Sequence, residues 1–275
     1  MNTALTLCLV PEARHGPFVL HAGVVEGCAQ AAALGFRALE LFPRSAEEVD
    51  ARTLKQALAQ HHLTLAAVGT GAGWVAHHLS LTDPDPRQRA RARDFAGALV
   101  ALAGGFGAPA IIGSIQGRAG AEESREHALE WLADALEQLG PRAHACGVPL
   151  LLEPLNRYET NLLTRFDDAL AVLARLRTRN VKLVADLFHM NLEERSLPAA
   201  LTLAGGQLGH VHWADSNRQA AGLGHTDFAP IAQALRGIGY AGCVSAEVLP
   251  LPDPATAARQ TLASVHALFP PSPAS

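Results

Sequence analysis

The sequence is poor in aromatic residues and in charge. Aromatic side chains make up 5% of the 275 residues and charged side chains 17%, with a formal net charge of −4. Proteins that bind single-stranded nucleic acid stack bases on many aromatic side chains, and duplex binders need a broad basic face to neutralise phosphates. Both shortages exclude a nucleic-acid partner for this chain.

Long apolar runs and paired cysteines are also missing. No stretch approaches the ~20 apolar residues of a membrane span, and the first residues, MNTALTLCLVPEARHG, lack the basic start and long apolar run of a signal peptide. We therefore expect a cytoplasmic protein without a membrane partner. With no CxxC pair, the cysteines predict neither a zinc ribbon nor a disulfide framework, and we expect all four to be small reduced core residues. They are Cys8, Cys28, Cys146 and Cys243.

What the sequence does have is a regular alternation of short apolar runs and longer amphipathic segments. Eight runs are nearly continuously apolar, as is typical of parallel strands covered on both faces. These runs are residues 6–10, 37–42, 64–69, 109–114, 149–154, 181–186, 208–213 and 243–248. The segments between them are rich in alanine and predict helices. Examples are residues 19–35, 86–107, 124–147 and 166–177.

This alternation predicts the fold class. Strands that alternate with helices form a parallel sheet with right-handed crossovers, and eight units in some 270 residues fit a closed (β/α)₈ TIM barrel better than an open sheet. A GxGxxG motif is absent after the first run, and we interpret GTGAG at 69–73 as a mobile glycine loop rather than a phosphate cradle. We expect one barrel domain over 1–268 and a Pro/Ser-rich tail that frays over 269–275.

The last four predicted strands each end in a polar residue. In a TIM barrel the active site lies at the carboxyl ends of the strands. A lone charge in an apolar strand is costly, and three neighbouring carboxylates repel one another, so a divalent cation bound by all of them is the cheapest arrangement. Separate helix caps or ion pairs with loop arginines are the alternative. The residues are Glu153, Asp186, His212 and Glu247.

The loops that follow these strands are dense in hydrogen-bonding groups, which suits a small polyhydroxylated ligand. Two of these groups, Arg157 and Arg218, could form structural ion pairs with Glu159 or Asp215 instead of binding a ligand. His210 lies two residues before His212 and therefore points the same way from its strand. It is either a competing ligand or a core residue, and we favour the core.

Several segments occur together in an order that resembles a known family. They are EPLNRYET, ADLFHMNLEE, GHVHWADSNR, GLGHTDF and SAEV, and they lie between about residues 149 and 250. The chain is similar to the xylose isomerase-like barrels, and within them to ketose 3-epimerases of the tagatose/psicose type and related sugar isomerases. The sequence departs from that pattern at Leu187, where the epimerases have Thr, and at Ala214–Ser216, where they have a GES-type stretch.

The resemblance assigns roles to particular residues. It implies that Glu153, Asp186, His212 and Glu247 bind the metal, that Glu153 and Glu247 also act as acid and base, and that Glu159, His189 and Arg218 bind substrate. Carboxylate and imidazole ligands favour Mn²⁺, with Mg²⁺, Co²⁺ and Zn²⁺ as alternatives. Members of the family are commonly dimers or tetramers, so we expect a homo-oligomer. The roles of His225 and Asp227 stay open.

The residues and the resemblance together favour an isomerase. We expect a metal-dependent epimerase that acts on a free ketose by glutamate-mediated proton transfer through a cis-enediolate, with 3-epimerisation preferred. An aldose–ketose isomerase of the hydroxypyruvate type and an inosose-type dehydratase would use the same site. A phosphodiesterase of the endonuclease IV kind conflicts with the net negative charge. A non-catalytic sugar-binding barrel would leave two opposed glutamates without a purpose.

Overall fold

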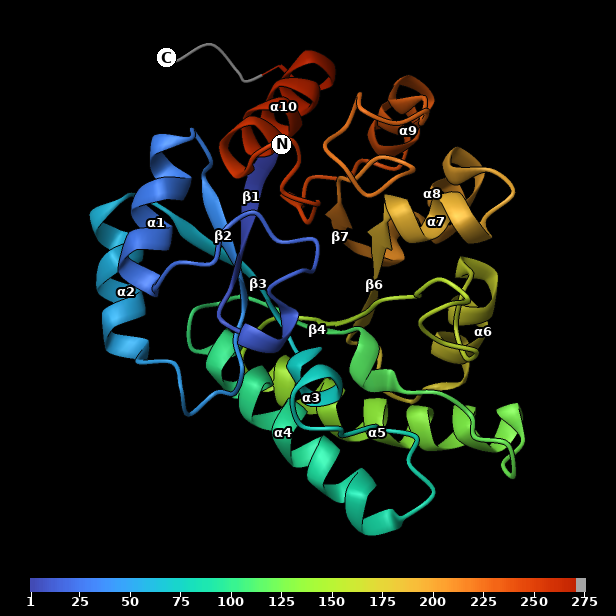
Figure 1. The fold of residues 1–275 in the computed structure, drawn as a ribbon. Helices are drawn as coiled ribbons and strands as arrows, with labels where there is room; N and C mark the ends of the chain where they lie inside the picture. Colours follow the sequence, from blue (N-terminus) through green and yellow to red (C-terminus); the bar gives the residue numbers. More distant parts are fainter. Residues whose placement is uncertain (271–275) are drawn as a thin grey trace.

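The computed structural model describes residues 1–270 and shows a closed barrel of eight parallel strands surrounded by helices (Figure 1). Each strand pairs with the next in sequence, and β8 (Cys243–Ala246) closes the barrel against β1 (Asn2–Cys8). The predicted (β/α)₈ TIM barrel is therefore confirmed. Residues 271–275, which form most of the predicted Pro/Ser-rich tail, lie outside the described residues.

All eight predicted strands are present, several of them shorter than predicted. The other six are β2 (Ala38–Phe42), β3 (Thr64–Gly69), β4 (Ala110–Ile112), β5 (Leu150–Leu152), β6 (Val181–Asp186) and β7 (Leu208–His212). β1 begins four residues earlier than the apolar run, because its first residues pair with β8. β4 and β5 end early because the residues after them leave the ladder to form the mouth of the barrel.

The helices cover the outside of the barrel. They are α1 (Val24–Ala33), α2 (Ala51–Gln60), α3 (Ala72–Val75), α4 (Pro86–Gly104), α5 (Arg125–Ala145), α6 (Phe166–Arg175), α7 (Leu187–Glu193), α8 (Leu197–Ala204), α9 (Phe228–Gly237) and α10 (Pro254–Leu268). Side-chain oxygens of Asp50, Ser124 and Asp253 accept backbone N–H groups at the starts of α2, α5 and α10, as strong N-caps do. None of the helices in the described part of the chain is long and apolar enough to cross a membrane.

Two local predictions are wrong. The helix expected over 19–35 begins only at Val24, because Leu20 forms a bridge with Leu7 of β1 before the chain turns. GTGAG at 69–73 is not a free loop: Gly69 ends β3, and Ala72 and Gly73 are buried in α3. A Cβ on Gly71 would lie 2.8 Å from Ser114 Oγ, so this glycine permits a close approach of two chain segments.

The four cysteines differ in how far they are buried. Cys8 and Cys28 are buried, Cys243 is intermediate and Cys146 is exposed, and all four are free. The core prediction is therefore wrong for Cys146. This residue ends α5, and Gly147 after it takes a positive φ of 74° that turns the chain.

The barrel interior contains a small apolar cluster below the mouth. It has one residue from each of four consecutive strands, namely Ala67, Ile111, Leu151 and Val184. Ile111 also lines the cavity at the mouth, so this cluster forms part of its floor. The floor is therefore apolar on the side of β3 to β6.

Candidate metal centre and active site

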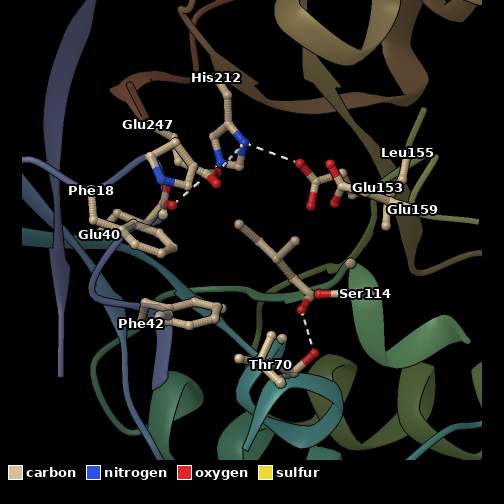
Figure 2. Close-up of a pocket in the computed structure, with 18 of the residues that line it drawn as sticks. Phe18, Glu40, Phe42, Thr70, Ser114, Glu153, Leu155, Glu159, His212 and Glu247 are labelled. Atoms are coloured by element: carbon tan, nitrogen blue, oxygen red, sulfur yellow. Dashed lines mark hydrogen bonds and ion pairs between the residues drawn. The ribbon is translucent and has the colours of Figure 1, made fainter. Parts of the chain in front are cut away.

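The four polar residues that end the last strands meet at one point in the barrel mouth. Glu153 follows β5, Asp186 ends β6, His212 ends β7 and Glu247 follows β8. One ligand atom from each lies within 4.8 Å of all the others. His212 Nδ1 is 3.1 Å from a Glu153 oxygen, 3.5 Å from Asp186 Oδ2 and 2.8 Å from a Glu247 oxygen. Figure 2 shows Glu153 and Glu247 on opposite sides of the His212 ring.

The donor set fits a divalent cation. Asp186 Oδ2 and both ring nitrogens of His212 are buried, and none of these atoms has a hydrogen-bond partner among the described residues. Buried polar atoms without partners are costly, and a cluster of three carboxylates adds mutual repulsion. A cation at the centre of the cluster would remove the repulsion and would partner Asp186 Oδ2 and His212 Nδ1, the two unpartnered atoms that face it. Carboxylate oxygens with one imidazole suit Mn²⁺ or Mg²⁺ more than a thiolate-rich zinc site would.

Two of the carboxylates have opposite electrostatic environments. Burial raises the pKa of Glu153; His212 opposes this by its charge and hydrogen bond, but burial, with smaller contributions from the charges of Glu247 and Asp186, keeps the pKa raised. Burial acts on Asp186 in the same sense, but His189, His212 and Arg218 outweigh it and hold the pKa of Asp186 below its ordinary value. Pairs of groups whose environments separate their pKa values in this way are typical of acid–base sites. Their surroundings thus favour the protonated form of Glu153 more than that of Asp186.

A glycine and a glutamine keep Glu153 in place. A Cβ on Gly113 would lie 2.6 Å from Glu153 Oε2, so a side chain at this position would displace the carboxylate from the place it occupies. Gln116 is fully buried, and its Nε2 donates to the backbone oxygens of Gly113 at 3.2 Å and Glu153 at 2.9 Å. The backbone on both sides of the carboxylate is therefore tied to the barrel.

The three predicted substrate-binding residues line a cavity of about 330 Å³ together with three of the four clustered residues, Glu153, His212 and Glu247. Arg218 Nη1 is 3.3 Å from Glu159, and Nη2 is 3.1 Å from Glu247. The structural pairing of Arg218 with Glu159 thus exists, whereas Asp215 takes no part in it. Arg157 pairs with Glu193 instead.

His189 is oriented by its neighbours. It lies in α7, and Nδ1 accepts a hydrogen bond from the backbone N–H of Asn156 at 3.3 Å. The side chain of Asn156 also donates to Glu159 at 2.9 Å. Because Nδ1 acts as an acceptor, the neutral ring carries its proton on Nε2. This leaves a donor on the ring edge that faces the cluster, where Nε2 is 3.6 Å from Asp186 Oδ2.

An apolar wall faces the carboxylates across the cavity. Phe18 and Phe42 stack with ring centroids 4.8 Å apart, and Figure 2 shows them on the side away from Glu153. Ser114 and Thr70 lie at the bottom of the same view. Sequence reasoning missed these residues because small and aromatic side chains in loops carry no distinctive pattern.

Sequence reasoning also missed Glu40, which lines the cavity from β2. The signal was present, because Glu40 stands inside the apolar run RALELF and is 3% exposed. A lone carboxylate is as costly to bury inside a strand as at its end, so Glu40 is as distinctive a residue as the four polar strand ends.

The structure assigns places to the three residues left open. His210 is buried, and its Nε2 lies 2.7 Å from Glu40 Oε2, so it belongs to the barrel core as favoured. His225 Nδ1 lies 2.9 Å from Ser216 Oγ in the loop after β7. Asp227 caps α9 by accepting the N–H of Ala229 at 3.1 Å.

Comparison with known proteins agrees with this geometry. The model of the xylose isomerase-like TIM barrel family matches residues 28–266. The chain belongs to this family. An L-ribulose 3-epimerase from Methylomonas sp. (strain DH-1) is 31% identical over 231 residues, which cover 82% of this chain and 78% of that protein.

Sequence matches to several other relatives of this xylose isomerase-like barrel cover shorter segments, whereas structural matches extend over nearly the whole chain. A D-psicose 3-epimerase from Ruminiclostridium cellulolyticum is 38% identical over 114 residues, and the match covers 42% of this chain and 39% of that enzyme. The solved structure of an L-ribulose 3-epimerase superposes with a TM-score of 0.81 at 25% identity, and covers 98% of this chain and 95% of that one. The likeness of fold thus extends over the whole barrel, beyond the segment of highest sequence identity.

The loop that carries Arg218 in this family member is organised by one buried aspartate. Asp215 accepts the backbone N–H groups of Ser216 at 2.7 Å, Thr226 at 3.0 Å and Gly222 at 2.8 Å. Arg218 has a positive φ of 60°, and its N–H donates to the backbone oxygen of Asp215 at 2.8 Å. A non-glycine residue in this conformation is strained and persists only where its surroundings hold it.

This arrangement predicts a pH-dependent contribution to stability. Burial raises the pKa of Asp215, but backbone N–H donors outweigh burial and lower it to about 2 from 3.8. A lowered folded-state pKa contributes stability above the unfolded value, and that contribution is lost as the pH falls toward 2. Between pH 6 and pH 3, wild type should lose about 1 kcal/mol more unfolding free energy than Asp215→Asn.

Urea unfolding of both proteins in EDTA measures this difference. Asp227→Asn is the matched control, because it is a neighbouring aspartate that caps a helix outside this loop. Parallel pH profiles for wild type and Asp215→Asn would contradict the prediction.

Proposed function

We propose that this barrel is a divalent-metal-dependent epimerase of a free ketose, with 3-epimerisation favoured and Mn²⁺ as the preferred ion. The observation that carries the proposal is the placement of Glu153 and Glu247 on either side of His212 at the base of a 330 Å³ cavity. Epimerisation at one carbon needs two proton carriers on opposite faces, since a single base would restore the original configuration. The names of the epimerase relatives support the same assignment.

The proton transfers can be assigned to this chain's residues. A bound cation would polarise the substrate carbonyl and stabilise negative charge on its oxygen. One glutamate takes the proton from C3, and the C–H electron pair forms the C2–C3 double bond of a cis-enediolate while the carbonyl electrons move to oxygen. The other glutamate donates a proton to the opposite face of C3 and the carbonyl forms again. The product is an isomer, so atoms and electrons balance.

The remaining polar side chains would orient the sugar. His189 presents an Nε2 proton beside the cluster, and Arg218 places its guanidinium between Glu159 and Glu247. Both can donate to substrate oxygens, and Glu159 can accept from a hydroxyl. Phe18 and Phe42 offer an apolar face to the carbon side of the sugar.

The charge of the cavity favours a neutral substrate. Among the described residues that line it, Arg218 alone carries a permanent positive charge, and it is already paired with two glutamates. Glu12 adds negative charge at the same cavity. A phosphorylated sugar or hydroxypyruvate would bring further negative charge into a cavity already lined by five glutamates, where the proposed cation and Arg218 are both engaged by carboxylates. A free ketose avoids that cost, which places the hydroxypyruvate-type isomerase second.

The experiment is a panel of free ketoses in D₂O with Mn²⁺, followed by NMR. We expect deuterium at C3 and a C3-epimeric product for at least one ketose. Deuterium at C1 with an aldose product would replace the proposal with an aldose–ketose isomerase, and ultraviolet absorbance of an enone would indicate a dehydratase. No exchange into any ketose would overturn enzymatic function and favour a sugar-binding barrel.

A cytoplasmic location and a homo-oligomeric state remain predictions for this chain. We propose a dimer or tetramer from the resemblance to the epimerases. Light scattering coupled to size-exclusion chromatography measures the assembly, and a single-chain mass of about 29 kDa would contradict it.

A further inference from the structure

A second polar cluster lies directly beneath the four-residue site. Glu40 projects from β2 into the barrel interior and is 3% exposed, although it carries a carboxylate. Its Oε2 lies 2.7 Å from His210 Nε2, and its Oε1 accepts from Thr6 Oγ1 at 3.4 Å. Side chains of β1 and β7 therefore contact this carboxylate of β2, and Ser245 of β8 lies 3.3 Å from the Thr6 hydroxyl.

Glu40 also faces the imidazole that belongs to the upper site. Its Oε1 is 3.3 Å from His212 Nε2, which is ion-pair distance without hydrogen-bond geometry, so a small rotation of either side chain is needed to form the hydrogen bond. The other ring nitrogen, Nδ1, faces Glu153, Asp186 and Glu247. The two nitrogens of one ring thus point at two different groups of carboxylates. A histidine that binds a cation through Nδ1 must carry its proton on Nε2, and a carboxylate beside Nε2 favours that tautomer.

We propose that Glu40 is a positioning residue that raises the affinity of the metal centre by holding the Nε2 proton and the ring orientation of His212. This inference rests on the proposed metal site. Glu40 touches neither the cation nor the substrate in this role. His210 supports it from the other carboxylate oxygen, at 2.7 Å.

The competing interpretation is a second cation site. Glu40, His210 and His212 also bring one ligand atom each within 4.8 Å of one another. The close contact between Glu40 Oε2 and His210 Nε2 has the length of a strong hydrogen bond and fills the space between two of those atoms. We therefore favour a hydrogen-bonded support over a second ion, and binding stoichiometry separates the two.

The test is isothermal titration of Mn²⁺ into metal-free wild type, Glu40→Gln and Glu40→Met. Glutamine keeps one acceptor oxygen but loses the charge, and methionine loses both. Outer partners of metal-bound histidines typically contribute about 10–100-fold to metal affinity. We expect one Mn²⁺ per chain throughout, with Kd about 10-fold higher in Glu40→Gln and approaching 100-fold higher in Glu40→Met.

Ser245→Ala is the matched control, because Ser245 lies in the same buried layer and its hydroxyl contacts Thr6 rather than His212. It should leave the Mn²⁺ Kd unchanged, and thermal unfolding of each metal-free variant reports structural damage separately. Variants with wild-type Kd but lower Tm would show that Glu40 only fills the core and would overturn the proposal. Two Mn²⁺ per wild-type chain, falling to one in Glu40→Met, would also overturn it. A wild type that binds no Mn²⁺ would instead reject the metal centre under Proposed function.

Discussion

Glu153→Gln and Glu247→Gln should each lower kcat for ketose epimerisation by about 10⁴ or more, because each removes a general acid–base group together with a carboxylate of the metal cluster. The two residues come from β5 and β8 and lie on opposite sides of His212 (Figure 2). Neither can replace the other, since each reaches one face of the substrate carbon. Steady-state kinetics with the best ketose of the panel measures the loss.

Isotope exchange tests the two-base arrangement more sharply than rate alone. With Glu153 replaced, Glu247 can still exchange the C3 proton of the epimer whose C–H bond faces it, and the reverse holds for Glu247→Gln. Each variant in D₂O should therefore label a different member of the epimer pair, while wild type labels both. NMR integration of the C3 signal reports this pattern.

Glu12→Gln is the control for this pair of variants. Glu12 lines the same cavity but pairs with Arg44 at its rim and lies apart from the four-residue cluster. It should keep kcat within about threefold of wild type, since it removes a surface charge only. Near-normal turnover in both Glu153→Gln and Glu247→Gln, with Mn²⁺ bound, would end the assignment of these glutamates as proton carriers.

Metal removal should abolish activity and also lower thermal stability. Metal-free protein retains buried acceptors without partners and three carboxylates around one imidazole. A ligand present at 100 times its Kd stabilises the folded state by about 2.7 kcal/mol. For a chain of this size, that corresponds to a rise in Tm of about 5–10 °C when Mn²⁺ is added. Differential scanning calorimetry with EDTA and with Mn²⁺ measures the rise.

Asp186→Asn separates the contribution of the Asp186 charge to metal binding from the contribution of this residue to the fold. Asp186 accepts the N–H groups of Phe188 and His189 at the start of α7, and asparagine is an equally good N-cap. The metal-free variant should therefore unfold within a few degrees of wild type but show no rise with Mn²⁺. Asp50→Asn makes the same exchange at the N-cap of α2, away from the cluster, and should keep the full rise. A normal Mn²⁺ response in Asp186→Asn would remove this residue from the set of ligands.

The barrel and the members of the cluster could be predicted because each depends on a local signal. Apolar runs separated by helical segments fix the strand order in a parallel fold, and the placement of carboxyl strand ends at one mouth follows from that order. Glu153, Asp186 and His212 therefore converge as their positions in the chain imply. The ends of β4 and β5 were predicted two residues too late, because the residues that follow each strand, 113–114 and 153–154, carry no signal that marks where strand pairing stops.

Other features depend on contacts between distant segments. Cys146 stands among apolar neighbours in the sequence, yet the end of α5 turns it to solvent. Gly113 does not belong to a recognisable sequence motif. Its role is visible only in the structure, where the missing side chain leaves space for the Glu153 carboxylate. The sequence suggested that Asp215 could pair with Arg218. In the structure its carboxylate instead accepts hydrogen bonds from three backbone N–H groups of its own loop. None of these outcomes is encoded by residue type alone.

The sequence by itself determined the barrel, its mouth and the four polar strand ends, because hydrophobic period and chain order act over short distances. Only the tertiary structure decided how those ends are supported. Closing the barrel lets side chains of β2 and β7, which are separated by β1 and β8, meet in its interior, so that Glu40 contacts His210 and His212, 170 and 172 residues further along the chain. That meeting arises from strand tilt and barrel closure, which no local pattern of residues records.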